Sequence, residues 1–254
     1  DEGELLNSKV RIQYKPTESS KLFIEKKATY LEYRYPNLLS KSTFEQNPGS
    51  NDKGAAGTPT AYTHQIENTD VIELGSTFKI NKNIETNFDY SFVDQKRVIS
   101  SERKYKNHYY DGNIKYSSGH LTIITGGQYF TGNRRCDNCN GTDTPTTTTK
   151  ENAGLYIQGQ YDFNSTIISL GARKEWIDYT FENLGTTTTE NQDNLAAFDI
   201  GLNKSLNDSF NIFSNFNYAF QTHNLDNFFD FQGNFAGFLE PVITSTLNIG
   251  FNHL

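Results

Sequence analysis

Long apolar segments are absent from this chain of 254 residues. No stretch approaches the roughly 20 consecutive apolar residues that a membrane-spanning helix requires. The mean hydropathy is -0.68, which agrees with that absence and excludes a helical membrane protein. An excess of positive charge is also lacking, because 23 Lys and Arg face 30 Asp and Glu and the formal net charge is -7. Nucleic-acid binding depends on excess positive charge, so the composition argues against nucleic acid as a partner.

Cysteine is nearly absent, and its two copies, Cys136 and Cys139, form a single C-x-x-C pattern. A redox role for this pattern requires a thioredoxin-like helix, which the surrounding sequence does not indicate. The pair could bind a metal ion together with His64 or His108, since thiolate and imidazole suit soft or borderline metals. In an oxidising compartment a small loop disulfide between Cys136 and Cys139 is the better explanation.

Aromatic residues are abundant, with 15 Tyr and 19 Phe, and apolar residues recur at every second position. Residues 152–163 show the pattern, with Ala153, Leu155, Ile157, Tyr161 and Phe163 on one face and polar side chains on the other. A period of two is typical of a β-strand. Only Asn164 and Ser165 separate this strand from the next one, so the two are expected to form a tight hairpin.

The predicted hairpins have short turns at one end and long polar loops at the other. A soluble β-sandwich gives no reason for that asymmetry. An outer-membrane β-barrel does, because its periplasmic turns are short, its extracellular loops are long, its apolar side chains face lipid and its polar side chains face the lumen. The pattern therefore predicts an all-β, antiparallel transmembrane β-barrel.

About eleven strands are expected, at residues 9–15, 22–35, 70–80, 84–92, 105–116, 121–130, 152–163, 168–176, 196–203, 210–220 and 242–254. Loops are expected at residues 36–69, 95–104, 131–150 and 178–194, and a bulge is expected near Lys26. An odd number of antiparallel strands cannot close on itself without a parallel seam. Either the strand count is wrong by one, or residues 1–254 are part of a larger barrel. We expect the second, an incomplete segment with further strands on both sides.

The later part of the chain resembles the barrel of TonB-dependent outer-membrane receptors. Tyr-Ile-Gln at 156–158 followed by Gly-Ala-Arg at 171–173 is similar to that family's paired strands. Ile-Gly-Leu at 200–202, Phe-Ser-Asn-Phe at 213–216, Leu-Glu-Pro at 239–241 and Ile-Gly-Phe at 249–251 resemble its central barrel segment. The chain departs from the family pattern at Gln221, near which a Pro is usual, and at Val242 and Asn248, where Glu is usual.

The resemblance implies a central piece of a barrel of about 22 strands in the outer membrane of a Gram-negative bacterium. It also implies a receptor that binds a scarce nutrient such as a ferric siderophore or similar metal chelate. The implied partners are outer-membrane lipid, the small-molecule chelate and a TonB-type periplasmic energy-coupling protein. Two alternatives are a complete small porin-like channel and a soluble β-rich surface-binding module.

No catalytic group, resident metal or cofactor is expected, because no nucleophile and base are brought together by the sequence. Candidate ligand contacts are charged lumen-facing residues and the last long loop, which is rich in Asn and Phe. These candidates are Asp89, Asp111, Arg173, His223, Phe228 and Phe229.

Overall fold

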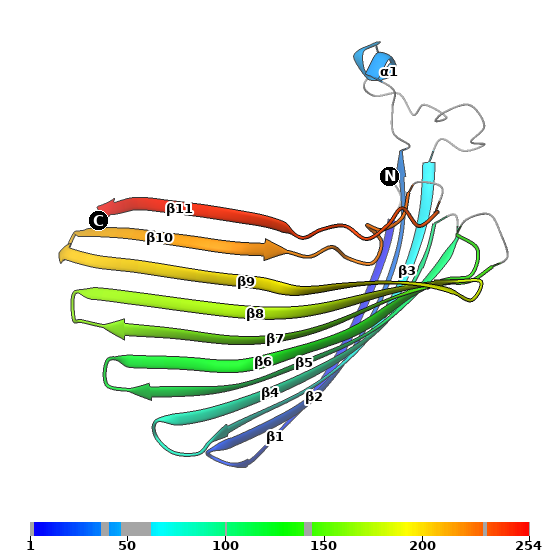
Figure 1. Cartoon of the computed structure of the whole chain (residues 1–254). Coiled ribbons are helices and arrows are strands. Elements are labelled where there is room, and N and C mark those ends of the chain that lie inside the picture. Colours follow the sequence, from blue (N-terminus) through cyan, green and yellow to red (C-terminus); the bar gives the residue numbers. More distant parts are fainter. Residues whose placement is uncertain are drawn as a thin grey trace.

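The computed structural model describes residues 3–36, 41–46, 62–99, 101–139, 144–230 and 233–253. Eleven antiparallel strands form one sheet in which spatial order follows sequence order (Figure 1). The strands are β1 (Gly3–Thr17), β2 (Ser20–Pro36), β3 (Tyr62–Lys79), β4 (Ile84–Val98), β5 (Glu102–Ser118), β6 (Leu121–Cys136), β7 (Thr146–Asp162), β8 (Thr166–Asn183), β9 (Thr186–Asn207), β10 (Phe210–Gln221) and β11 (Val242–His253). One short helix, α1 (Lys41–Gln46), lies between β2 and β3. Within the described ranges no helix has the length and apolar character needed to cross a membrane.

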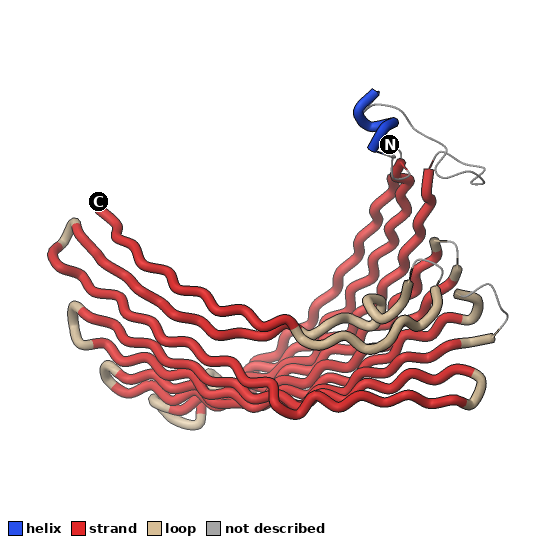
Figure 2. The backbone as a smooth tube through the Cα atoms, turned by 45° about the horizontal axis from the view of Figure 1, so that its top comes forward, coloured by secondary structure: helices blue, strands red, loops and turns tan. Residues whose placement is uncertain are grey.

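The sheet bends into a trough, and Figure 2 shows its concave side facing upward. Within the described part of the chain, β1 pairs only with β2 and β11 only with β10, so the sheet is open. The all-β antiparallel fold is confirmed, and so is the count of eleven strands for the described residues.

Alternate residues separate the two faces as the sequence pattern predicts. Leu155, Leu170 and Ile200 lie on the convex face with 59%, 53% and 49% of their surface exposed. Such exposure of large aliphatic side chains is costly in water and is normal where they face lipid. The concave face carries the polar alternate positions.

Aromatic side chains mark two levels of the convex face. Tyr90, Tyr110 and Tyr129 are direct partners on adjacent strands, and neighbouring ring centroids are 4.9 and 6.0 Å apart. Nearer the short turns, Tyr161 and Phe163 have ring centroids 4.3 Å apart. Aromatic girdles at both interfaces are typical of membrane barrels.

The strands are longer than predicted at the end away from the short turns. The threonine runs at 146–149 and 186–189 were expected in loops, but they lie in β7 and β9. Leu184 and Gly185, at φ 50° and 78°, make the tight turn between β8 and β9. Threonine is β-branched and suits a strand. The expectation was wrong because these extensions lack the apolar alternation that identifies a strand in lipid.

Two further expected loops and one expected bulge are also corrected. The expected loop at 95–104 belongs mostly to β4 and β5. β3 begins inside the expected loop at 36–69. Residues 37–40 and 47–61 of that loop lie outside the described residues. The register of β2 runs unbroken past Lys26 against both neighbours, so no bulge occurs there. Lys26 faces outward and its Nζ lies 2.6 Å from Asp70 Oδ1, so an ion pair accommodates the charge without a bulge.

The face assignment leads to a testable difference between two neighbouring residues of β8. Leu170→Arg places a charge on the lipid-facing side and should cost about 2–4 kcal/mol near the membrane midplane. Ser169→Arg places the same side chain on the concave side and should be tolerated better. Unfolding of the full-length protein in lipid by guanidinium would measure both, and equal losses would show that the faces are wrongly assigned.

Candidate functional site

A cavity of about 740 Å³ lies on the concave side of the sheet. Its walls come from strands β2 to β8, and residues 222–226 close one side. These residues begin the connection between β10 and β11, whose described residues, 222–230 and 233–241, we call the inner segment. Figures 1 and 2 show this connection turning toward the other strands and lying over the trough.

The inner segment rests on an apolar core. Ile177, Tyr179 and Leu195 supply the strand side of this core, and Leu225 and Phe228 supply the segment side. Phe228 has no exposed surface, and its ring meets Tyr179 edge-on at 5.0 Å between centroids. This part of the concave face is therefore apolar, although a barrel interior is usually polar.

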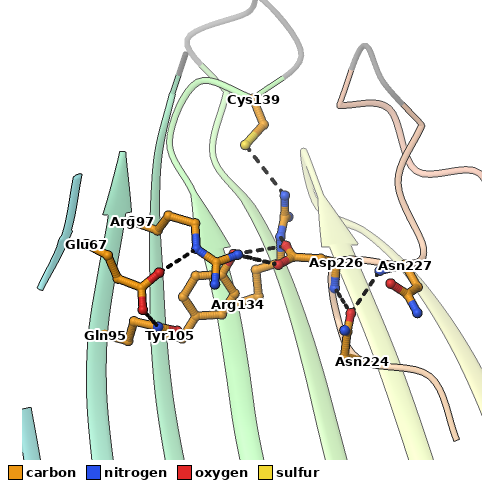
Figure 3. A network of polar contacts seen from close by, with 9 residues as sticks. All are labelled: Glu67, Gln95, Arg97, Tyr105, Arg134, Cys139, Asn224, Asp226 and Asn227. Carbon is orange, nitrogen blue, oxygen red and sulfur yellow. Dashed lines mark hydrogen bonds and ion pairs between the residues drawn. The ribbon is translucent and has the colours of Figure 1, made fainter. Parts of the chain in front are cut away.

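Asp226 ties the inner segment to the opposite strands (Figure 3). Its Oδ1 accepts a hydrogen bond of 2.7 Å from Arg134 Nε, and both oxygens accept at 2.9 Å from the Tyr105 hydroxyl. Arg97 Nη1 lies 3.4 Å from Oδ2. The side chain of Arg134 is only 1% exposed, so the Asp226 carboxylate supplies the counter-charge of a buried cation.

Neighbouring side chains fix the position of this carboxylate. Asn224 Oδ1 accepts hydrogen bonds from the backbone N–H groups of Asp226, at 3.0 Å, and Asn227, at 3.2 Å. Such a turn is a common role of Asn. On the strand side, Glu67 Oε2 accepts from Arg97 Nε at 3.2 Å. The ion pair between Asp226 and Arg97 is thus held in place by Asn224 on the inner segment and by Glu67 on the strand side.

Cys136 and Cys139 form a disulfide, as the sequence predicts. Arg134 Nη2 donates a hydrogen bond of 3.6 Å to Cys139 Sγ (Figure 3). Gly233 of the inner segment has φ +85°, and a Cβ at that position would collide with the backbone carbonyl of Cys139. The segment and the disulfide loop are therefore in close contact.

The disulfide loop also carries an ionised acid. Asp137 Oδ1 accepts a hydrogen bond of 2.7 Å from Arg135 Nε, and Lys104 Nζ lies 3.4 Å from Oδ2. The hydrogen bond from Arg135 and that from Lys104 lower the pKa of Asp137.

Four of the predicted ligand contacts line the same cavity: Asp89, Asp111, Arg173 and His223. Asp89 and Asp111 are direct partners across β4 and β5. Asp111 accepts hydrogen bonds from Gln128 Nε2 at 2.6 Å and from Asn113 Nδ2 at 3.1 Å. Arg173 pairs with Glu175.

The other two candidates, Phe228 and Phe229, do not line the cavity. Phe228 lies in the apolar core, and the Phe229 ring lies 3.8 Å from the guanidinium carbon of Arg134. Their contact with a ligand stays a prediction. Their observed contacts are with the wall and with the inner segment itself.

Sequence reasoning missed Asp226, Arg134, Tyr105 and Lys150. Asp226 is 92 residues from Arg134 in sequence, and no local motif predicts that contact. Lys150 falls in a region that was expected to be a loop, but it lies on β7 and lines the cavity. Among the described residues, no three His, Cys, Asp or Glu side chains are grouped to hold a metal ion.

The fold matches solved outer-membrane transporters. The ferric citrate transporter FecA has a TM-score of 0.71 at 16% identity, covering 99% of this chain and 41% of that chain. The ferric yersiniabactin uptake receptor FyuA from Yersinia pestis has a TM-score of 0.69 at 12% identity, and the match covers 99% of this chain and 43% of that chain. The copper transporter OprC has a TM-score of 0.71 at 11% identity, and the match again covers 99% of this chain and 43% of that chain. This chain thus spans about two fifths of the length of these structures.

No curated protein sequence matches the chain significantly. The family model described as "TonB dependent receptor-like, beta-barrel" matches residues 9–254, which is nearly the whole chain. The chain therefore belongs to the β-barrel family of TonB-dependent receptors, which are proteins of the Gram-negative outer membrane.

Proposed function

We propose that residues 1–254 form one transmembrane barrel segment of a receptor that takes up a scarce extracellular nutrient. The nutrient is a ferric siderophore or a similar metal chelate. A TonB-type periplasmic protein supplies the energy, and outer-membrane lipid surrounds the convex face. The chemistry is binding and conformational gating, and no bond is made or broken.

The cavity is the observation that carries this proposal. Its volume of about 740 Å³ falls in the range of small-molecule sites, which is roughly 300–1,000 Å³. Charged and aromatic side chains from strands far apart in sequence converge on it, among them Asp89, Tyr109 and Arg173. FecA and FyuA, whose folds match, are described as a transporter of ferric citrate and an uptake receptor for ferric yersiniabactin.

Uptake of radioactive iron tests the proposal. A strain lacking its own receptors would express the full-length protein and be supplied with a panel of ferric chelates. We expect one chelate to accumulate only when the receptor and the periplasmic energy coupling are both present. Accumulation that persists without energy coupling would indicate a passive channel, and accumulation of no metal chelate would overturn the proposal.

A further inference from the structure

We infer that Lys150 binds an anionic group of the ligand, and that Asp89 and Asp111 bind a cationic or hydrogen-bond-donating group of the same molecule. The ligand is thus an amphoteric chelate and not a polyanion. This inference rests on the proposed function and specifies its substrate class.

Lys150 is held in one position at the cavity wall. Its Nζ donates a hydrogen bond of 2.8 Å to Thr222 Oγ1 and one of 3.5 Å to the backbone carbonyl of His223. The same Nζ lies 5.5 Å from the ring centroid of Tyr179 and 6.0 Å from that of Phe130. These contacts from β6, β8 and the inner segment place the ammonium group before any ligand arrives.

Lys150 forms no direct ion pair with an acid, although the Glu175 carboxylate, which pairs with Arg173, attracts its charge from a longer distance. Among the described residues, no carboxylate oxygen lies within 4.0 Å of its Nζ, whereas Arg97 pairs with Glu67 and Asp226 and Arg173 pairs with Glu175. Lys150 is half-buried, so its solvation by water is incomplete. A partly buried cation without a counter-ion is costly, and an anionic ligand group would offset that cost.

Asp89 and Asp111 place an excess of negative charge elsewhere in the cavity. Asp89 and Asp111 face each other across a strand pair, an arrangement in which like charges repel. The Asp89 carboxylate makes no hydrogen bond or ion pair with any residue that the structure describes. A cationic ligand group would relieve this repulsion, while a polyanion would increase it.

Aromatic side chains complete the wall. Tyr109 and Phe130 line the cavity with ring centroids 4.8 Å apart, and Tyr109 is 45% exposed. They offer a surface on which the uncharged body of a chelate can rest.

The test uses three matched probes and the full-length receptor. The parent probe is a ferric hydroxamate chelate with one free carboxylate and one free ammonium group. The second probe is its methyl ester, which lacks the anion, and the third is its N-acetyl derivative, which lacks the cation. We expect the wild-type protein to bind each derivative about tenfold more weakly than the parent.

Variants connect each probe group to a residue. Lys150→Gln should bind the parent and the ester equally, and Lys150→Arg should keep the preference for the parent. Asp89→Asn should bind the parent and the N-acetyl derivative equally. The control variants are Lys106→Gln and Asp94→Asn, which alter the same charges on the convex face and should preserve both preferences.

Equal binding of all three probes by the wild-type protein would overturn the inference, and this result does not depend on any variant folding. An unchanged ester preference in Lys150→Gln would overturn it as well. Uptake of some other metal chelate without binding of these probes would overturn the inference and leave the proposed function standing. Failure to take up any metal chelate would overturn both.

Discussion

Replacing Asp226 with Ala should release the inner segment from the concave face, at a cost of about 3–5 kcal/mol. The carboxylate accepts hydrogen bonds from Tyr105 and Arg134 and forms an ion pair with Arg97. Removing it leaves Arg134, which is 1% exposed, without its negative partner. Breaking a buried pair in this way is more costly than the pair's net contribution suggests, because the remaining charge stays buried.

Limited proteolysis of the full-length protein in membranes measures this release. Chymotrypsin cleaves after Leu and Phe, and Leu225 and Phe228 become accessible only when the segment leaves the wall. Cleavage after Leu225 and Phe228 should accelerate by roughly a hundredfold or more if opening is fast relative to cleavage. Asp226→Asn keeps one acceptor oxygen and should show a smaller increase.

Glu240→Ala is the matched control for this experiment. Glu240 is an exposed acid of the same segment, and its side chain makes no hydrogen bond or ion pair with the described residues. Its loss should leave the cleavage rate unchanged. Equal acceleration in the Asp226 and Glu240 variants would mean that net charge, and not the specific ion pair, holds the segment.

The membrane-facing part of the fold could be predicted because lipid imposes one simple rule on the sequence. Every second side chain of a strand must be apolar there, and Leu155, Leu170 and Ile200 show that rule directly. The rule ends where the strands leave the membrane. The threonine runs of β7 and β9 are extended as well, but no lipid requires their side chains to alternate.

The cavity was predictable only in part, for the same physical reason. Asp89, Asp111 and Arg173 were assigned to the lumen by strand parity, and they do line one cavity. The alternation of side chains along the strands does not identify which long connection folds back over the trough. The contacts of Asp226 depend on that return of the chain, so the residues that hold the segment could not be identified from local patterns.

A second large effect is expected for Phe228→Ala, which should weaken docking of the inner segment by about 3–5 kcal/mol. The Phe228 ring has no exposed surface and meets Tyr179 and Phe238 edge-on, with centroids 5.0 and 5.1 Å away. Truncation leaves a cavity that the surrounding aromatic rings cannot fill without moving. Cleavage after Leu225, the monitored site that this variant keeps, should therefore accelerate as in Asp226→Ala.

Phe228→Leu separates this packing role from direct ligand contact. Leu keeps most of the buried apolar volume, so cleavage should accelerate less than in the Ala variant and the affinity for ligand should be nearly unchanged. Leu239→Ala, at a position 43% exposed on the same segment, is the control and should have little effect on cleavage after Leu225. If Phe228→Leu lost ligand binding while its proteolysis stayed like that of the wild-type protein, Phe228 would be a ligand contact, and its buried position would not describe the ligand-bound receptor.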